Sequence, residues 1–99
     1  MKITVARIYI NEGKHIHDKV FERLHDDHKV KGVTIFRGIS GFGKSGHEHS
    51  SSLLDMAFDL PVVVEFFDTE ENVRTALASL SDLIPPGHAI TFKAELPDV

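Results

Sequence analysis

The order in which two kinds of apolar pattern alternate along this chain limits its fold more than any other feature. Four runs have the two-residue period or the β-branched content of strands, and two intervening stretches have the spacing of amphipathic helices. The predicted strands cover 3–10, 32–37, 61–67 and 89–96; the predicted helices cover 16–28 and, from a cap at Asp68 or Thr69, 70–84. The predicted order is therefore strand, helix, strand, strand, helix, strand.

This order predicts an α+β fold of the ferredoxin-like βαββαβ type, in which two helices cover one face of a four-stranded antiparallel sheet. The 99 residues form one domain, 1–99, with no internal linker. No further element is left to cover the second face of the sheet. The simplest cover is the same face of another copy, so we expect a symmetric oligomer.

Composition excludes several classes of protein. The chain is 41% hydrophobic and 26% charged, and it has no apolar run near the roughly 18 residues of a membrane span. The N-terminus enters a strand pattern without the apolar core of a signal peptide, which favours the cytoplasm. The absence of cysteine excludes disulfides, thiolate metal sites and cysteine nucleophiles. A formal charge of −4 argues against a nucleic-acid partner.

A glycine- and serine-rich stretch follows the predicted second strand. Residues 38–52 hold four glycines and five serines, and so long an irregular segment in a compact domain is usually functional or disordered. Glycines can present successive backbone N–H groups to an anion, and Lys44 would add a positive charge. A phosphate-binding loop and a flexible surface loop are both compatible with this composition.

Part of this stretch also matches a phosphate-binding motif of nucleotide hydrolases. Residues 38–45 satisfy G-x-x-x-x-G-K-[ST], and Val62–Glu65 resembles the second motif of such enzymes. A genuine P-loop leads into a helix, but 46–52 contains poor helix formers. Phosphotransfer through Lys44 is therefore only a lesser alternative, and we expect no enzymatic activity.

Histidines provide a second alternative chemistry. His47 and His49 flank Glu48, and neutral imidazole is a common ligand of zinc, copper and nickel. Two histidines do not complete a site, so these side chains are either solvated or part of a metal site shared between copies of the loop. His15 and His17 flank the start of the predicted first helix, without a chemical role predicted for them.

Two segments resemble the PII signalling proteins. Gly32-Val33-Thr34 is followed by Gly41-Phe42-Gly43, by Lys44 and by Gly46-His47, as in that family. The segments Arg37–Gly43 and Asp59–Val63 are more similar still to a PII-like group called domain of unknown function 190. The resemblance covers nearly the whole chain, with the same element order.

The resemblance implies a trimeric regulatory protein. A long T-loop, here about 38–54, would reach toward a partner such as a membrane transporter or channel, and adenine nucleotides would lie in clefts between subunits. The copper-tolerance proteins share this fold, so a metal-binding trimer through the loop histidines is the alternative. The implied ligand positions are Thr34, Arg37, Gly41, Phe42, Gly43, Lys44 and Gly87; the alternative metal ligands are His47 and His49.

Departures from the PII pattern indicate the size of the ligand. PII proteins have a lysine after the proline of the third strand and two C-terminal arginines, whereas here Val62 follows Pro61 and residues 93–99 contain no arginine. Fewer cations compensate a triphosphate poorly, so AMP or ADP is expected rather than ATP. The loop tyrosine that PII proteins modify is also missing, because Tyr9 is the only tyrosine.

Overall fold

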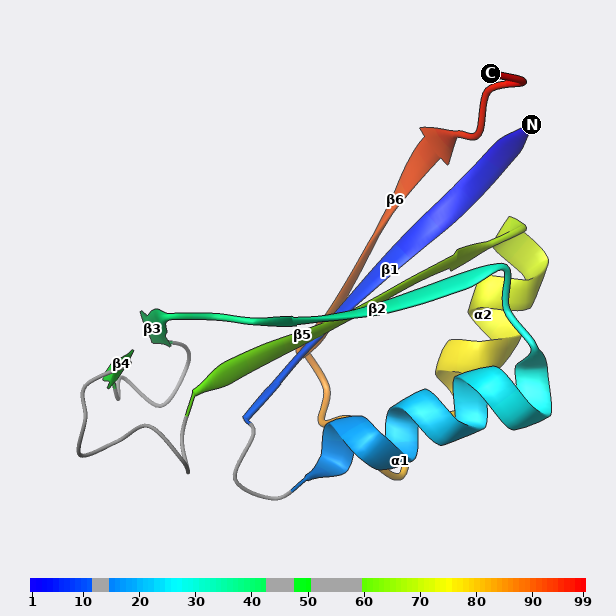
Figure 1. Ribbon diagram of the computed structural model, residues 1–99. Helices are drawn as coiled ribbons and strands as arrows, with labels where there is room; N and C mark the ends of the chain where they lie inside the picture. Colours follow the sequence, from blue (N-terminus) through cyan, green and yellow to red (C-terminus); the bar gives the residue numbers. More distant parts are fainter. Residues whose placement is uncertain (12–14, 43–47, 51–59) are drawn as a thin grey trace.

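A computed structural model describes residues 1–11, 15–42, 48–50 and 60–99 of the chain (Figure 1). One sheet runs through the molecule, and the helices and a short second ribbon are attached to it. The elements are β1 (Lys2–Asn11), α1 (Ile16–Glu22), the π-helical segment η2 (Arg23–His28), β2 (Gly32–Arg37), β3 (Ser40–Phe42), β4 (Glu48–Ser50), β5 (Pro61–Asp68), α2 (Glu70–Ser79) and β6 (Ala89–Glu95).

The main sheet is antiparallel with the strand order β2-β5-β1-β6. Its centre is β1, which pairs with β5 from Thr4 opposite Asp68 and with β6 from Lys2 opposite Glu95. The strands β2 and β6 form the two edges. The predicted ferredoxin-like arrangement is therefore confirmed.

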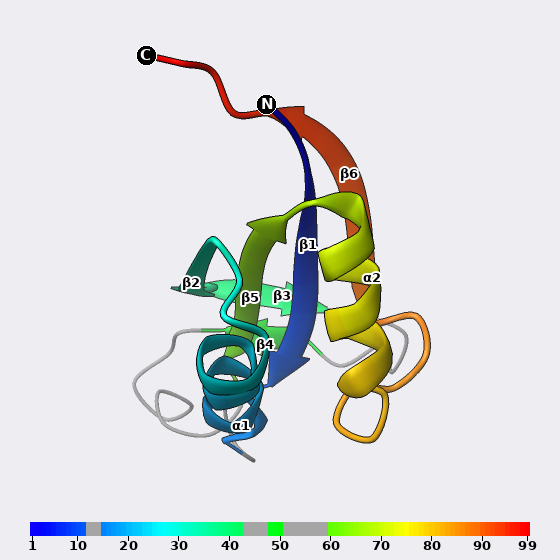
Figure 2. The ribbon, with the colours of Figure 1, turned by 90° about the vertical axis from the view of Figure 1, so that its right-hand side faces the viewer.

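Both helices cover the same face of this sheet (Figure 2). Alternation along β1 and β5 directs one set of apolar side chains toward the helices, and these side chains are almost completely buried. The helices contribute their own apolar stripes, as predicted. The core consists of Ala6, Ile8, Ile10, Val20, Leu24, Val62, Val64, Phe66, Val73, Ala76 and Leu80.

The helices differ from the prediction at their C-terminal ends. The first ends at His28, as predicted, but its residues 23–28 form a π-helix, and the backbone of the C-cap residue Lys29 is left-handed with φ of 49°. Residues 25–28 are all polar, so the spacing of apolar residues cannot distinguish the wider π-helical turn from an α-helical one. The second helix ends at Ser79 rather than near 84, because the chain turns and Leu83 donates to the carbonyl of Leu80. Its N-cap is Thr69, which accepts from the backbone of Asn72 at 3.2 Å.

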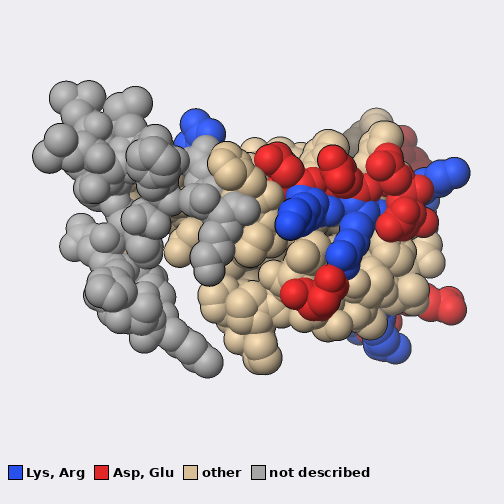
Figure 3. Space-filling view, turned by 90° about the horizontal axis from the view of Figure 1, so that it is seen from below, with Lys and Arg blue, Asp and Glu red and all other residues tan. Residues whose placement is uncertain are grey.

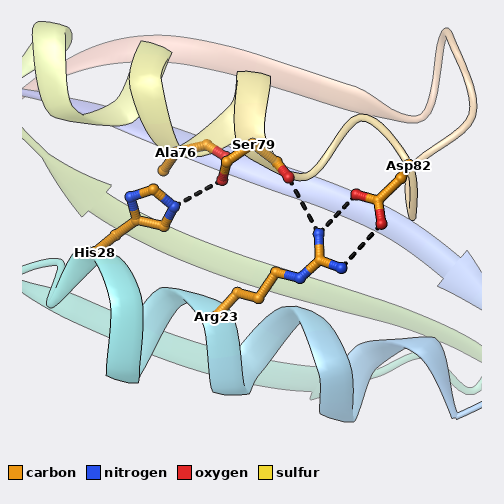
Figure 4. Close-up of polar contacts among 5 residues, drawn as sticks. All are labelled: Arg23, His28, Ala76, Ser79 and Asp82. Carbon is orange, nitrogen blue, oxygen red and sulfur yellow. Dashed lines mark hydrogen bonds and ion pairs between the residues drawn. The ribbon is translucent and has the colours of Figure 1, made fainter.

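Polar contacts join the two helical segments at their outer surface (Figure 4). Arg23 donates to both carboxylate oxygens of Asp82, at 2.6 and 2.9 Å, and to the carbonyl of Ser79 at 3.1 Å. The Ser79 hydroxyl donates to the carbonyl of Ala76, so the 2.6 Å contact with His28 Nε2 is one in which His28 donates. Acidic and basic side chains are interspersed on the face seen from below (Figure 3).

The composition of residues 38–52 predicts no regular structure directly after β2, and this prediction is wrong for the part that the structure describes. The strands β3 and β4 pair in antiparallel fashion, with Gly41 opposite His49. Serine and glycine are weak strand formers, so the local sequence does not show this pairing. The remainder of the predicted T-loop, residues 43–47 and 51–54, lies outside the described residues.

Candidate functional site

The base of the Gly-rich stretch is attached to the start of β5. Arg37 is the last residue of β2, and the next backbone N–H, that of Gly38, donates to the carbonyl of Pro61 at 2.7 Å. Gly41 lies against the same proline: a Cβ at this position would be 3.5 Å from Pro61 Cγ, an ordinary contact distance. The junction of β2 and β3 is therefore held in one place on the sheet.

Gly38 is required at this junction because it has no side chain. A Cβ on Gly38 would lie 2.7 Å from Pro61 Cγ and 3.3 Å from the Pro61 carbonyl oxygen. Neither the proline ring nor the backbone can move away easily. Gly38 belongs to the predicted loop but is not one of the predicted site residues, because only its contact with Pro61 in the structure identifies its role.

Gly87 lies at the same end of the sheet but near the other edge. Its φ of 83° is a left-handed conformation that favours glycine. The next residue, His88, is fixed to the end of β1: Tyr9 N–H donates to the His88 carbonyl at 2.8 Å, and His88 Nδ1 donates to the Tyr9 carbonyl at 3.0 Å. Gly87 thus precedes β6, whereas Arg37 and Gly41 adjoin β2. The edge strands are three strand spacings apart, about 14 Å.

Thr34 lies on the sheet face that points away from the helices, which we call the open face. It is opposite Glu65, whose carboxylate accepts from Arg7 Nε at 2.8 Å. This hydrogen bond raises the pKa of Arg7. Arg7 also lies 5.1 Å above the ring of Phe92, in the position of a cation–π contact. A charged pair thus crosses the middle of the open face.

The rest of the open face is largely apolar. Tyr9, Phe36, Ile90 and Phe92 are all exposed there, from four positions on three different strands. Such a group of large exposed apolar side chains usually marks an interaction surface. The element order predicts an uncovered sheet face, but it does not predict the Arg7–Glu65 pair. The only indication in the sequence is one charged residue within each of the predicted strands 3–10 and 61–67.

Several of the predicted site residues are only partly described. Phe42 and His49 are placed by their backbones in β3 and β4, and their side chains lie outside the described part of the chain. Gly43, Lys44 and His47 lie outside it altogether. The structure therefore does not test the predicted loop metal site.

The P-loop alternative disagrees with the element that follows the motif. In the residues that the structure describes after the Gly-rich motif, Glu48–Ser50 forms a strand, whereas a P-loop places a helix there. The same residues contain no helix N-terminus that could face a phosphate bound by Lys44. In the described chain, no helix is long and apolar enough to cross a bilayer.

The sheet order and the two helices on one face define a ferredoxin-like fold, from which a β-ribbon extends beyond β2. Two solved structures share this fold: CPII from Thiomonas intermedia K12, bound to ADP and bicarbonate (TM-score 0.68, 20% identity, 95% of this chain and 85% of that chain), and the divalent cation tolerance protein CutA1 from Thermus thermophilus (TM-score 0.64, 12% identity, 100% and 87%).

Sequence comparison then gives the family. The family model DUF190 (Uncharacterized ACR, COG1993) matches residues 3–96, and the chain belongs to this family. A curated relative, a UPF0166 protein of Aquifex aeolicus strain VF5, is 35% identical over 69 residues, which cover 70% of this chain and 65% of the relative. The matched part of the chain thus spans just under two thirds of that relative's length. The predicted resemblance is confirmed.

Proposed function

We propose that this chain is a PII-like regulatory protein that acts without catalysis, assembles as a homotrimer and binds AMP or ADP between subunits. The fold is that of CPII, a protein whose structure contains ADP. The proposal transfers this class of ligand to the positions that the family resemblance implies: Thr34, Arg37, Gly41, Phe42, Gly43, Lys44 and Gly87.

The observation that carries the proposal is the position of three of these residues at two opposite edges of one sheet. Arg37 and Gly41 adjoin β2, and Gly87 adjoins β6, about 14 Å away across the sheet. One chain therefore supplies two half-sites at the same end of the sheet. A neighbouring copy whose β6 edge approaches the β2 edge would bring both halves into one cleft.

The open face supports a trimer. Its exposed apolar side chains need a cover, and its Arg7–Glu65 pair gives each copy both a positive and a negative group for its neighbours. In a closed ring, three such faces meet around a shared axis. The two helices remain outside, where charged residues of both signs lie (Figure 3).

The preference for a short phosphate chain follows from the start of β5. Val62 is only 2% exposed and belongs to the core beneath the helices, so position 62 gives no cation to a phosphate. The C-terminal segment contributes Lys93 but no arginine. A third phosphate of a nucleotide in this cleft would therefore have fewer charge-assisted contacts than the lysine and arginines of the PII pattern would provide.

The response to the ligand would be a change in the T-loop, about 38–54. This loop leaves the sheet beside Gly38 and Gly41, so a ligand at these residues would contact its base. The proposed output is altered contact with a partner in the cytoplasm or at its membrane, such as a transporter or channel.

Calorimetric titration of the purified protein with AMP, ADP and ATP tests the nucleotide half of this proposal. We expect AMP or ADP to bind more tightly than ATP. Arg37→Gln should weaken this binding, while Arg74→Gln, on the exposed side of α2, should leave it unchanged. No heat with any nucleotide from the folded oligomer would overturn nucleotide binding, and a preference for ATP would overturn the argument from missing cations.

A further inference from the structure

The first turn of α1 brings two histidines and an aspartate together. His15 Nδ1 lies 3.8 Å from Asp18 Oδ2, and His17 Nε2 lies 3.5 Å from Asp18 Oδ1. One potential ligand atom from each residue lies within 4.8 Å of the other two, and the two imidazole centroids are 5.9 Å apart. None of these residues belongs to the proposed nucleotide cleft or to the loop pair His47 and His49.

The backbone of His15 has an unusual conformation. Its φ of 53° and ψ of 26° are left-handed, which is uncommon for a residue with a Cβ, although histidine adopts it more often than most residues. His15 occupies the N-cap position, but its side chain makes no capping hydrogen bond. The ring instead lies beside His17 and Asp18.

His17 is not explained by ordinary hydrogen bonding. Its side chain is only 13% exposed, and its Nδ1 atom is buried with no hydrogen-bond partner in the part of the chain that the structure describes. Its Nε2 atom approaches Asp18 at 3.5 Å, which is longer than the usual 2.7–3.2 Å of a good hydrogen bond. Among the described residues, neither nitrogen of this ring has a good hydrogen bond, which is an exception for a largely buried imidazole and leaves Nε2 available as a ligand atom.

We propose that His15, His17 and Asp18 form a binding site for a borderline divalent cation, with Zn²⁺ as the representative ion. Two imidazole nitrogens and one carboxylate oxygen are a donor set that zinc accepts, whereas Mg²⁺ and Ca²⁺ prefer oxygen alone. Three protein ligands leave one tetrahedral position for water or another ligand.

The distances suit such an ion. Ligand atoms about 2.0–2.1 Å from a tetrahedral zinc are about 3.3 Å from each other. The two nitrogen–oxygen distances, one to each carboxylate oxygen of Asp18, are 3.5 and 3.8 Å, and one ligand atom from each of the three residues lies within 4.8 Å of the other two, so the side chains must move closer around the ion. An ion between His17 Nε2 and the carboxylate would replace a long contact with two metal–ligand bonds.

A second histidine–aspartate contact in the same chain provides a matched control. His25 Nδ1 lies 2.8 Å from Asp26 Oδ1, and both side chains are well exposed. Among the described residues, no third metal-ligating side chain joins His25 and Asp26. The one group of three such side chains in that part of the chain is His15, His17 and Asp18. If both contacts were only surface pairs, substituting His15 and substituting His25 would have the same effect on zinc binding.

The test is calorimetric titration of the metal-free protein with Zn²⁺. We expect one ion per chain, retained in the double variant His47→Asn/His49→Asn. His15→Asn is chosen because asparagine tolerates the left-handed backbone. His15→Asn and Asp18→Asn, each made separately, should weaken zinc binding by about 10- to 100-fold, the loss that removal of a residue hydrogen-bonded to a metal ligand already produces. His25→Asn should bind as the unchanged protein does.

A second measurement separates a lost ligand from a lost fold. Zn²⁺ should raise the melting temperature of the unchanged protein and of His25→Asn, but not that of Asp18→Asn. Because the Asp18 side chain is 65% exposed, the metal-free melting curve of Asp18→Asn should be nearly unchanged. The proposed site would be overturned if the unchanged protein bound no zinc, or if binding were lost only in the His47→Asn/His49→Asn variant. It would also be overturned if His25→Asn lost as much binding as His15→Asn, or if Mg²⁺ competed with Zn²⁺ equally well.

Discussion

Gly38 and Pro61 are in direct contact where β2 leaves the sheet and β5 enters it. The Gly38 N–H donates to the Pro61 carbonyl at 2.7 Å, and the proline ring occupies the space that a side chain at position 38 would need. This contact fixes the point from which the proposed ligand loop begins. Position 38 therefore combines a backbone hydrogen bond with a steric requirement for glycine.

Substituting this glycine should be far more harmful than substituting its neighbour Gly41. A Cβ at position 38 would lie 2.7 Å from Pro61 Cγ, so Gly38→Ala should destabilise the fold by about 1–3 kcal/mol, as overpacking does. A Cβ at position 41 would be 3.5 Å from the same atom, so Gly41→Ala serves as the control. Urea unfolding of both variants measures the difference, and equal stabilities would contradict the steric requirement.

Asp68 should make stability depend on pH. Burial alone would raise its pKa, but hydrogen bonds from Thr69 N–H, Asn72 Nδ2 and Lys31 N–H outweigh burial and lower the pKa below its usual range. A carboxyl whose pKa is lower in the folded state stabilises the fold above its unfolded pKa. That stability is present at neutral pH and is lost as the pH falls below about 4.

Asp68→Ala tests this assignment. The variant should lose roughly 1–3 kcal/mol at pH 7, because the three donors lose their acceptor. The difference from the unchanged protein should be smaller at pH 3, because below about pH 4 the unfolded chain binds a proton at Asp68 more readily than the folded protein does. Urea unfolding at both pH values gives the comparison, with Asp98→Ala at the exposed C-terminus as a control. A difference of the same size at both pH values would exclude the carboxylate charge as the cause.

The contact between Arg23 and Asp82 should depend on the shape of the guanidinium group. Two parallel hydrogen bonds to the carboxylate lower the pKa of Asp82, and lysine cannot form such a pair. Arg23→Lys should therefore lower the melting temperature more than Arg74→Lys, whose arginine makes one contact with Glu70 at 3.2 Å. Equal melting temperatures for the two variants would show that the paired geometry adds nothing to stability.

The sheet and helices could be predicted because their apolar residues repeat along the sequence. The alternation through Ala6, Ile8 and Ile10 has the two-residue period of a strand, and the buried face follows from it directly. The β3–β4 ribbon could not be predicted, since Ser40 and Gly41 have no strand preference and the partner strand begins only at Glu48. Its pairing depends on tertiary structure rather than on local sequence.

Clusters of polar residues were less predictable than the fold. Arg7 and Glu65 are 58 positions apart, and only the register between β1 and β5 brings them together. His15, His17 and Asp18 are close in sequence, yet their juxtaposition depends on a left-handed backbone at His15 that residue spacing does not reveal. In both cases the residue types were visible, but the geometry that relates them was not.

The open face offers a direct test of the proposed trimer. Phe92 and Phe21 are almost equally exposed, at 39% and 38%, but Phe92 lies on the open face and Phe21 on α1, where it stacks on His25. A charge at Phe92 would have to be buried when copies assemble, which is strongly unfavourable without a partner. Phe92→Glu should therefore shift the protein toward monomers, whereas Phe21→Glu should leave the assembly intact. Light scattering coupled to size-exclusion chromatography measures both, and a Phe92→Glu variant that stays trimeric would place the interface elsewhere.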